Sequence, residues 1–226
     1  MKLVNAKYNI VLDLKENISN VLIIENRRAF TDIVEDLYIQ GNAETGNFML
    51  SEDGKMLKFR DIVETILNPI SLEINSKKVL NRLYTHLQNV ANDYFEEKEK
   101  LNGLWISLLD QIILQSCYDN LEMDLNIDWP ALFKLYNVKV QTQYDSLLEK
   151  LSEYVHVLST LSSKRVLVFI NLKSYLDKTE LEMLYQSAFY NKIYLVLIEA
   201  NEHYKIDNEY ISILDSDLCW IEKGLS

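Results

Sequence analysis

The sequence predicts an α/β protein with a parallel-sheet core and a helical subdomain. Residues 166–170 and 193–198 are wholly apolar, which is typical of strands buried on both faces. Helical patterns alternate with these strands, and a β-α-β-α-β order forms a parallel sheet with right-handed crossovers. We therefore expect an α/β core at residues 1–75 and 129–226, and a helical subdomain with an acidic strand at 76–128.

The first part of the chain predicts a strand, a helix and a hairpin. Residues 21–25 form an apolar β-branched run, and apolar residues at three-four spacing follow from Ala29 to Tyr38. Residues 48–59 predict a hairpin, because Asp53-Gly54 at its centre readily adopts the positive φ angles of a tight turn.

The chain after Ser76 predicts two helices that pack antiparallel. One apolar stripe runs from Val79 to Tyr94, and a second helix carries apolar doublets between Leu104 and Ile113. We expect Asn102-Gly103 to separate these two helices, because glycine is common just past a helix end.

The second half of the chain predicts the rest of the parallel core. Residues 137–141 are expected to form a strand, and Thr142 with Asp145 resembles a capping box that opens a long helix. Asp177 and Glu180 are expected to cap the helix between the two wholly apolar strands. Residues 218–221 predict a last strand.

Composition limits the compartment and the cysteine chemistry. The apolar runs are far shorter than the roughly 18 residues of a membrane span, and the N-terminus lacks the apolar stretch of a secretory signal. We expect a cytoplasmic protein. Cys117 and Cys219 are far apart, without a CxxC pattern, so we expect two buried free thiols rather than a disulfide or a zinc site.

The loops expected after the strands lack the glycines that phosphate binding needs. Neither GxxxxGK[ST] nor GxGxxG occurs among the five glycines, which stand at 41, 46, 54, 103 and 224. The sheet is therefore expected to be of a degenerate nucleotide-binding, P-loop-like type without a phosphate loop. His86, His156 and His203 stand singly, and no nucleophile motif accompanies them. We expect a protein that binds rather than an enzyme.

An acidic segment between Asp119 and Asp128 is the clearest candidate metal site. Its oxygen-bearing residues alternate with apolar ones, so a strand would place them on one face: Glu122, Asp124, Asn126 and Asp128. A Ca²⁺ ion would relieve their repulsion, since it takes six to eight oxygen ligands. Two alternatives stay open. The segment could be a solvated edge strand, and Asp128, which precedes Trp129-Pro130, could cap a helix.

The net charge of −11 opposes nucleic-acid binding unless cations gather locally. Several basic residues follow the acidic segment, and each could equally solvate an exposed helix face. The candidates for phosphate contact are Lys134, Lys139, Lys150, Lys164 and Arg165.

At this point the chain resembles a known family, the CRISPR-associated Csn-two proteins of type II-A systems. The resemblance rests on residues 137–145 (NVKVQTQYD), 147–151 (LLEKL), 164–171 (KRVLVFIN) and 193–199 (IYLVLIE). The early strand with its helix and the acidic segment after Cys117 follow in the matching order.

The resemblance implies a ring-shaped homotetramer that binds double-stranded DNA ends in a lysine-lined hole without sequence preference. It implies no catalysis, and a role in spacer acquisition beside the CRISPR integrase and effector nuclease. It also implies calcium held by acidic residues, for which Asp119, Glu122, Asp124 and Asp128 are the candidates here, and it makes Lys134 and Lys139 the best channel candidates. Two alternatives remain: a nucleotide-dependent enzyme with an atypical phosphate loop, and a protein-protein scaffold.

Overall fold

The structure is a computed structural model that describes residues 1–43, 45–118, 120–125 and 128–225. It divides into two compact units, an α/β unit of Met1–Ile74 with Thr142–Ser226 and a helical unit of Asn75–Gln141. The second boundary therefore lies after Gln141, whereas the sequence analysis placed it after Asp128. The reason is that α5 (Trp129–Leu135) packs against α3 (Lys77–Ala91) of the helical unit.

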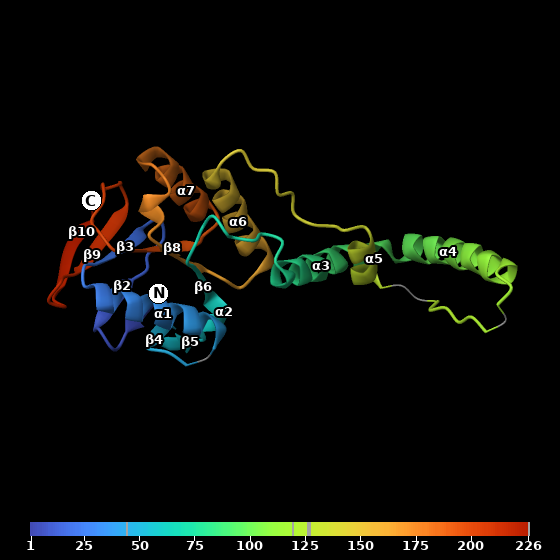
Figure 1. Ribbon diagram of the computed structural model, residues 1–226, viewed down its shortest axis with the longest axis horizontal. Helices are drawn as coiled ribbons and strands as arrows, with labels where there is room; N and C mark the ends of the chain where they lie inside the picture. The colour runs from blue at the N-terminus through green and yellow to red at the C-terminus, as the bar shows by residue number, and fades with distance from the viewer. Residues whose placement is uncertain (44, 119, 126–127, 226) are drawn as a thin grey trace. The chain divides into compact units, whose positions relative to one another are not determined.

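A largely parallel six-stranded sheet forms the centre of the α/β unit (Figure 1). Its strand order is β10-β9-β3-β8-β7-β6, and β10 at the edge is its antiparallel member. The strands are β3 (Ser19–Ile24), β6 (Val63–Ile66), β7 (Val166–Ile170), β8 (Tyr194–Glu199), β9 (Glu209–Leu214) and β10 (Trp220–Leu225). The expected parallel core is confirmed, whereas its relation to nucleotide-binding folds stays a prediction.

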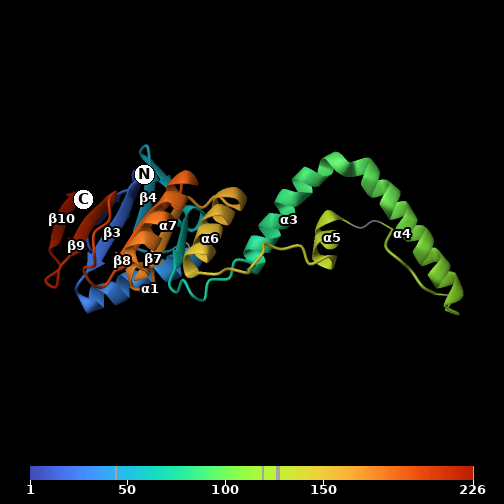
Figure 2. The ribbon, with the colours of Figure 1, turned by 90° about the horizontal axis from the view of Figure 1, so that it is seen from above.

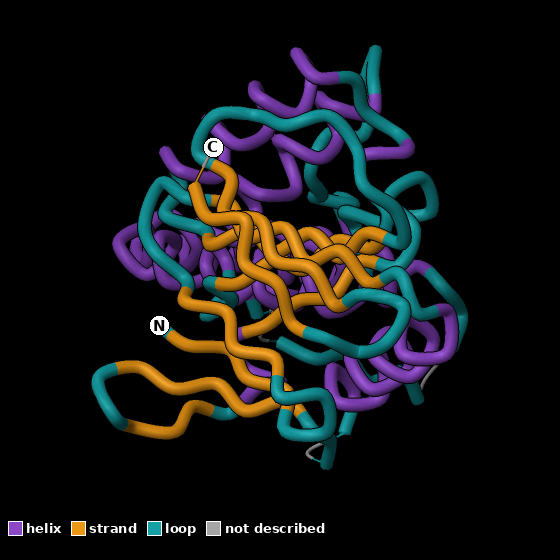
Figure 3. The backbone as a smooth tube through the Cα atoms, turned by 90° about the vertical axis from the view of Figure 1, so that its left-hand side faces the viewer, coloured by secondary structure: helices purple, strands orange, loops and turns teal. Residues whose placement is uncertain are grey.

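The two faces of this sheet carry different layers, as Figures 1 and 3 show. Helices α6 (Leu147–Leu161) and α7 (Lys178–Tyr190) cover one face. The other face carries α1 (Arg27–Asn42), the short helix α2 (Phe59–Ile62) and a small antiparallel sheet of order β2-β1-β4-β5. This small sheet consists of β1 (Lys2–Asn5), β2 (Ile10–Asp13), β4 (Phe48–Glu52) and β5 (Lys55–Leu57). Buried Leu22, Ile33 and Leu50 join the large sheet, α1 and the small sheet in one apolar core.

Several local predictions are confirmed. Asp53 and Gly54 form the β4–β5 turn with φ angles of 50° and 77°. At the start of α7, the Asp177 carboxylate accepts the Glu180 N–H at 2.9 Å, and the Glu180 carboxylate accepts the Asp177 N–H at 2.9 Å. These features depend on residues that are neighbours in the chain, which is why the sequence shows them.

Three local predictions in the α/β part of the sequence are wrong or shifted. Residues 137–141 form no strand and belong to the helical unit, because no neighbouring strand pairs with them. Helix α6 begins one turn later than expected, since Ser146 rather than Thr142 is its cap and accepts the Glu149 N–H at 3.1 Å. The last strand begins at Trp220, because Leu218 has a φ angle of 65° in the preceding turn.

The helical unit differs from the expected antiparallel pair. Helix α3 passes through a 3-10 turn, η1 (Asn92–Tyr94), into α4 (Phe95–Gln115), and Figure 2 shows the two helices meeting end to end. Gly103 lies inside α4 rather than at a break. A glycine inside a helix costs only about 1 kcal/mol, so strong helix formers on both sides outweigh it.

A network of buried polar groups supports the connection from β8 to β9. These parallel strands are joined by residues 200–208 without a helix. The ammonium of Lys173 lies 2.7 Å from Glu209 Oε1 and also donates to the Tyr204 carbonyl at 3.0 Å. The Tyr185 hydroxyl donates to Glu209 Oε1 at 2.7 Å. Because Lys173 and Glu209 side chains are 2% and 0% exposed, the charges are paired away from water.

Two further findings concern the expectations on cysteine and membranes. Cys117 and Cys219 are free, as expected, but both are exposed, so the prediction of burial is wrong. Cys117 follows the exposed end of α4, and Cys219 lies in the turn before the edge strand β10. Within the described residues, no helix combines the length and apolar character that crossing a membrane requires.

Candidate nucleic-acid interface

Charge is segregated along the sequence of the helical unit. Residues 75–91 and 128–141 contain a single carboxylate, that of Asp128, and five cations: Lys77, Lys78, Arg82, Lys134 and Lys139. In residues 92–127, by contrast, only Lys98 and Lys100 oppose eight carboxylates. We call the set of five cations the basic face.

Two contacts hold the separate segments of the basic face together. The Asn75 amide donates to the Val140 carbonyl at 2.8 Å and accepts the Val140 N–H at 3.0 Å. These bonds place Lys139 beside the start of α3, where Lys77 and Lys78 lie. The rings of Tyr84 and Phe133 pack at a centroid distance of 5.9 Å and join α3 to α5.

The carboxylate of Asp128 is already used inside this region. Its Oδ1 accepts the Ala131 N–H at 2.7 Å and so caps α5, as one sequence alternative predicted. Lys77, Lys78, Lys134 and Lys139 are exposed, and Arg82 is half-buried. Residues 75–91 and 128–141 contain no further carboxylate, so a phosphate approaching the exposed Lys77, Lys134 or Lys139 meets no other acid of these two segments.

Two of these five cations were predicted from the sequence as phosphate contacts, and three were not. Lys134 and Lys139 were predicted, whereas Lys77, Lys78 and Arg82 were not. A signal was present, since the Lys77-Lys78 doublet opens a 15-residue helix that contains no Asp or Glu. Spacing also places Lys78 and Arg82 one helical turn apart, hence on the same side of α3.

The other three predicted phosphate contacts lie in the α/β unit and bind groups of their own chain. Lys150 Nζ donates to the Ile70 carbonyl at 2.7 Å. Arg165 makes a two-pronged ion pair with Glu52, with N–O distances of 3.1 and 2.8 Å, and this pairing lowers the pKa of Glu52.

Lys164 is unsuited to DNA contact. Its residue is only 3% exposed, and its ammonium donates to the Arg60 and Val63 carbonyls and pairs with Glu64 at 3.1 Å. A phosphate cannot reach a buried ammonium that is already saturated with acceptors, so the assignment of Lys164 as a phosphate contact is wrong.

The described residues of the acidic segment do not form the expected ladder. The described residues between 120 and 128 contain no strand, so period-two placement on one face does not apply to Glu122 and Asp124. Asp119 and Asn126 lie outside the described residues. Throughout the described part of the chain, no group of three His, Cys, Asp or Glu side chains is placed to hold a metal ion. The described residues therefore form no preformed calcium site.

The helix start after the first core strand is occupied by the protein's own side chain. Asn26 Oδ1 accepts the N–H groups of Arg28 and Ala29, both at 3.1 Å, and caps α1. Phosphate loops use such helix N–H groups to bind an anion. This position consequently offers no support for the nucleotide-binding alternative.

Helix α4 carries an exposed apolar stripe. Side chains at three-four spacing lie on one side of the helix, and none of its residues is buried. The stripe consists of Leu101, Leu104, Trp105, Leu108, Leu109 and Ile112, which are 37% to 69% exposed. Apolar surface of this extent is typical of a protein interface.

The fold and the site together define a two-unit α/β protein with a candidate nucleic-acid interface and an apolar helix available for association. Residues 40–218 match the family model described as CRISPR-associated protein (Cas_Csn2). The chain belongs to this family, and the resemblance seen in the sequence is confirmed.

Two curated relatives bear the name CRISPR-associated protein Csn2. The chain is 27% identical to the one from Streptococcus agalactiae over 213 residues, which cover 90% of this chain and 95% of the relative. It is 28% identical to the one from Enterococcus faecalis over 202 residues, which cover 87% of this chain and 88% of the relative.

Proposed function

We propose that this protein binds the ends of double-stranded DNA without catalysis, as a ring-shaped homotetramer that supports spacer acquisition in CRISPR immunity. Membership of the CRISPR-associated family supports the biological setting. The observation that carries the DNA-binding part is the basic face, a gathering of five cations in a chain of net charge −11.

The proposal resolves the conflict between the net charge and a polyanionic ligand. Closed symmetry repeats each cation once per subunit around one axis, so a few residues generate a strongly positive passage. The carboxylates that dominate the total charge can face away from the DNA. A monomer would not reach the same local concentration of positive charge.

Self-association has its own support in α4. Its stripe is apolar, continuous and uncovered within the described residues, and a second copy of the same helix would bury it. In this proposal, α4 holds subunits together while the basic face contacts phosphates.

The DNA-binding proposal is tested by fluorescence anisotropy with labelled DNA over a range of salt concentrations. About two phosphate contacts per subunit would give about eight per ring and a log-log salt slope near −7. Lys139→Gln should weaken that slope to about −3.5, because it removes about four contacts from the ring. Lys100→Gln is the matched control, since Lys100 is an exposed lysine in the acidic part of the same unit.

A second arm compares linear duplex with covalently closed circles of the same sequence by gel shift. We expect retardation of the linear form only, because closed circles have no end to enter the ring. If neither the linear nor the circular DNA is retarded at low salt, a protein-protein scaffold becomes the better explanation of the exposed α4 stripe. Equal binding of both forms would contradict recognition of ends.

Calcium is a separate part of the proposal and rests on the family resemblance. The described residues form no preformed site, so we derive no structural step from the ion. Light scattering and gel shifts in Ca²⁺ and in chelator decide the matter. Identical mass and DNA affinity in both buffers would remove calcium from the proposal and leave the basic face untouched.

A further inference from the structure

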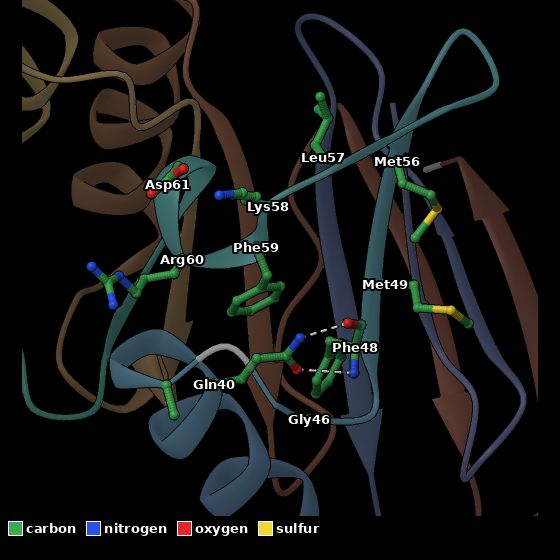
Figure 4. A pocket seen from close by; sticks show the side chains of 11 residues that line it. Gln40, Gly46, Phe48, Met49, Met56, Leu57, Lys58, Phe59, Arg60 and Asp61 are labelled. Carbon is green, nitrogen blue, oxygen red and sulfur yellow. Dashed lines mark hydrogen bonds between the residues drawn. The ribbon is translucent and has the colours of Figure 1, made fainter.

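A cavity in the α/β unit is separate from all the residues discussed as DNA contacts. It has a volume of about 320 Å³ and lies between the end of α1, the β4–β5 hairpin and α2 (Figure 4). This size is at the lower end of the range of small-molecule pockets. Its lining includes Gln40, Phe48, Phe59, Lys58, Arg60 and Asp61.

The cavity exists because β5 leaves β4 early and a side chain takes its place. Strand β5 pairs with β4 from Glu52 to Leu50, and the chain then turns away into α2. The Gln40 amide accepts the Phe48 N–H at 3.0 Å and donates to the Phe48 carbonyl at 2.6 Å, as Figure 4 shows. A Cβ atom on Gly46 would clash with the Gln40 side chain, so a larger residue there would have to displace this amide.

The lining of the cavity is mixed, with two aromatic rings beside polar and charged side chains. Phe48 and Phe59 form its floor, with ring centroids 5.9 Å apart. Met49 and Met56 also border the cavity, but Figure 4 shows their thioethers pointing away from Phe48 and Phe59, and the two residues are 43% and 64% exposed. Gln40 uses its amide oxygen and one of its two N–H donors on the Phe48 backbone.

The margin of the cavity is cationic. Lys58 and Arg60 are exposed, and neither side chain has a hydrogen bond or ion pair within the described residues. Among the described residues of the lining, Asp61 is the single carboxylate beside Lys58 and Arg60, so these three charged residues leave a positive balance. An anionic group held beside an apolar body would satisfy both features.

We propose that this cavity binds an apolar group that carries an adjacent negative charge, with the apolar body on the Phe48–Phe59 floor and the anion beside Lys58 and Arg60. Such chemistry occurs in a free aromatic carboxylate and in an acidic peptide with an aromatic residue. The site is independent of the proposed DNA interface.

The test measures binding of two probes to the full chain by ligand-observed NMR and calorimetry. The probes are 2-naphthoate and an acetylated, amidated Gly-Asp-Phe-Glu-Gly peptide. We expect saturable binding of at least one, weakened tenfold or more in the double variant Lys58→Glu with Arg60→Glu. The tighter probe identifies the source of the ligand.

The matched control is Lys2→Glu with Lys55→Glu, which makes the same charge change at exposed positions of the small sheet outside the cavity. This control should change affinity less than twofold, and thermal melts should show both double variants folded. The proposal is overturned if neither probe saturates at millimolar concentration, or if both double variants weaken binding equally. The cavity variant and the control variant should bind DNA equally well. A failure of the cavity proposal can therefore be distinguished from a failure of the DNA-binding proposal.

Discussion

Two side-chain amides in this protein act as substitutes for a neighbouring strand. Gln40 exchanges two hydrogen bonds with the backbone of Phe48, and Asn75 does the same with Val140. An amide can do this because it carries one acceptor and two donors, the complement of a backbone residue. Neither pairing was predictable from sequence, since each joins residues whose proximity depends on how the chain folds.

Glu199 is the residue whose protonation should most affect stability. It ends β8 fully buried, and its Oε1 accepts the Lys173 N–H at 3.1 Å. His203 Nε2 lies 3.5 Å from Oε2. Burial raises the pKa of Glu199 to about 7, although its backbone hydrogen bonds and the nearby Lys173 charge partly oppose this rise. Burial lowers the pKa of His203.

The free energy of unfolding should therefore fall as pH rises. A raised folded-state pKa means that the Glu199 contribution is fully present below its unfolded pKa of 4.5 and is lost as pH passes about 7. The loss is roughly 3 kcal/mol at about 1.4 kcal/mol per pKa unit. Glu199→Gln keeps an acceptor oxygen and stays neutral, so urea unfolding should show it more stable than wild type at pH 8 and similar at pH 5.

His203→Gln serves as the comparison, because the contribution of His203 to stability changes with pH in the opposite direction to that of Glu199. Its lowered pKa makes the folded state lose stability as pH falls through 6.5, so this variant should differ from wild type mainly at pH 5. The inference about the Glu199 carboxyl is wrong if the difference in free energy of unfolding between Glu199→Gln and wild type is the same at pH 5 and at pH 8.

Among the elements, the β8–β9 connection depends most on one ion pair. Parallel strands usually need a crossover of a dozen or more residues, most often a helix. Here residues 200–208 suffice, because Lys173 from η2 (Leu172–Ser174) and Tyr185 from α7 bind Glu209 at the start of β9. The Glu209 carboxylate also accepts the Ile206 N–H at 3.2 Å and so holds the loop itself.

Removing one partner of this pair should be strongly destabilising. Lys173→Met leaves the Glu209 carboxylate buried without its cation, which costs about 3–5 kcal/mol. Combining it with Glu209→Gln should cost less than the sum of the single changes, with a coupling of about 1–3 kcal/mol in denaturant unfolding.

Lys178→Met is the control for this cycle. Lys178 is an exposed lysine at the start of α7, 3.8 Å from Glu182, and its loss should change stability by less than about 1 kcal/mol. Additive single effects of Lys173→Met and Glu209→Gln would show that the pair does not support the connection as a unit.

For the whole molecule, the exposed stripe of α4 should determine whether several copies associate. Leu104→Glu with Leu108→Glu places charges in the centre of the stripe. Light scattering should then report a lower mass, while the thermal melt of the α/β unit stays unchanged because α4 contributes no buried residue to it. If the double variant has both a lower mass and weaker DNA binding than wild type, then DNA binding depends on the assembly that α4 holds together.

Ser107→Glu with Gln111→Glu is the matched control, since it adds the same charge to α4 at exposed positions outside the stripe. It should leave the mass unchanged. If both double variants associate as wild type does, the stripe is not the interface between copies.

The sequence alone predicted the features that depend on neighbouring residues and on burial. The apolar runs of β7 and β8, the Asp53-Gly54 turn and the Asp177–Glu180 capping box follow from local chemistry, and the family resemblance rests on the same patterns. Charge along the sequence placed Lys134 and Lys139 among five candidates, and the family resemblance selected these two.

Only the tertiary structure decided features that need a partner from a distant part of the chain. An alternating segment becomes a strand only where another strand pairs with it, so residues 137–141 and the acidic segment did not follow their patterns. Burial likewise removed Lys164 from the surface and paired Lys173 with Glu209. Residue spacing describes a side chain's direction within its own element, whereas exposure and charge pairing depend on what the rest of the molecule places against it.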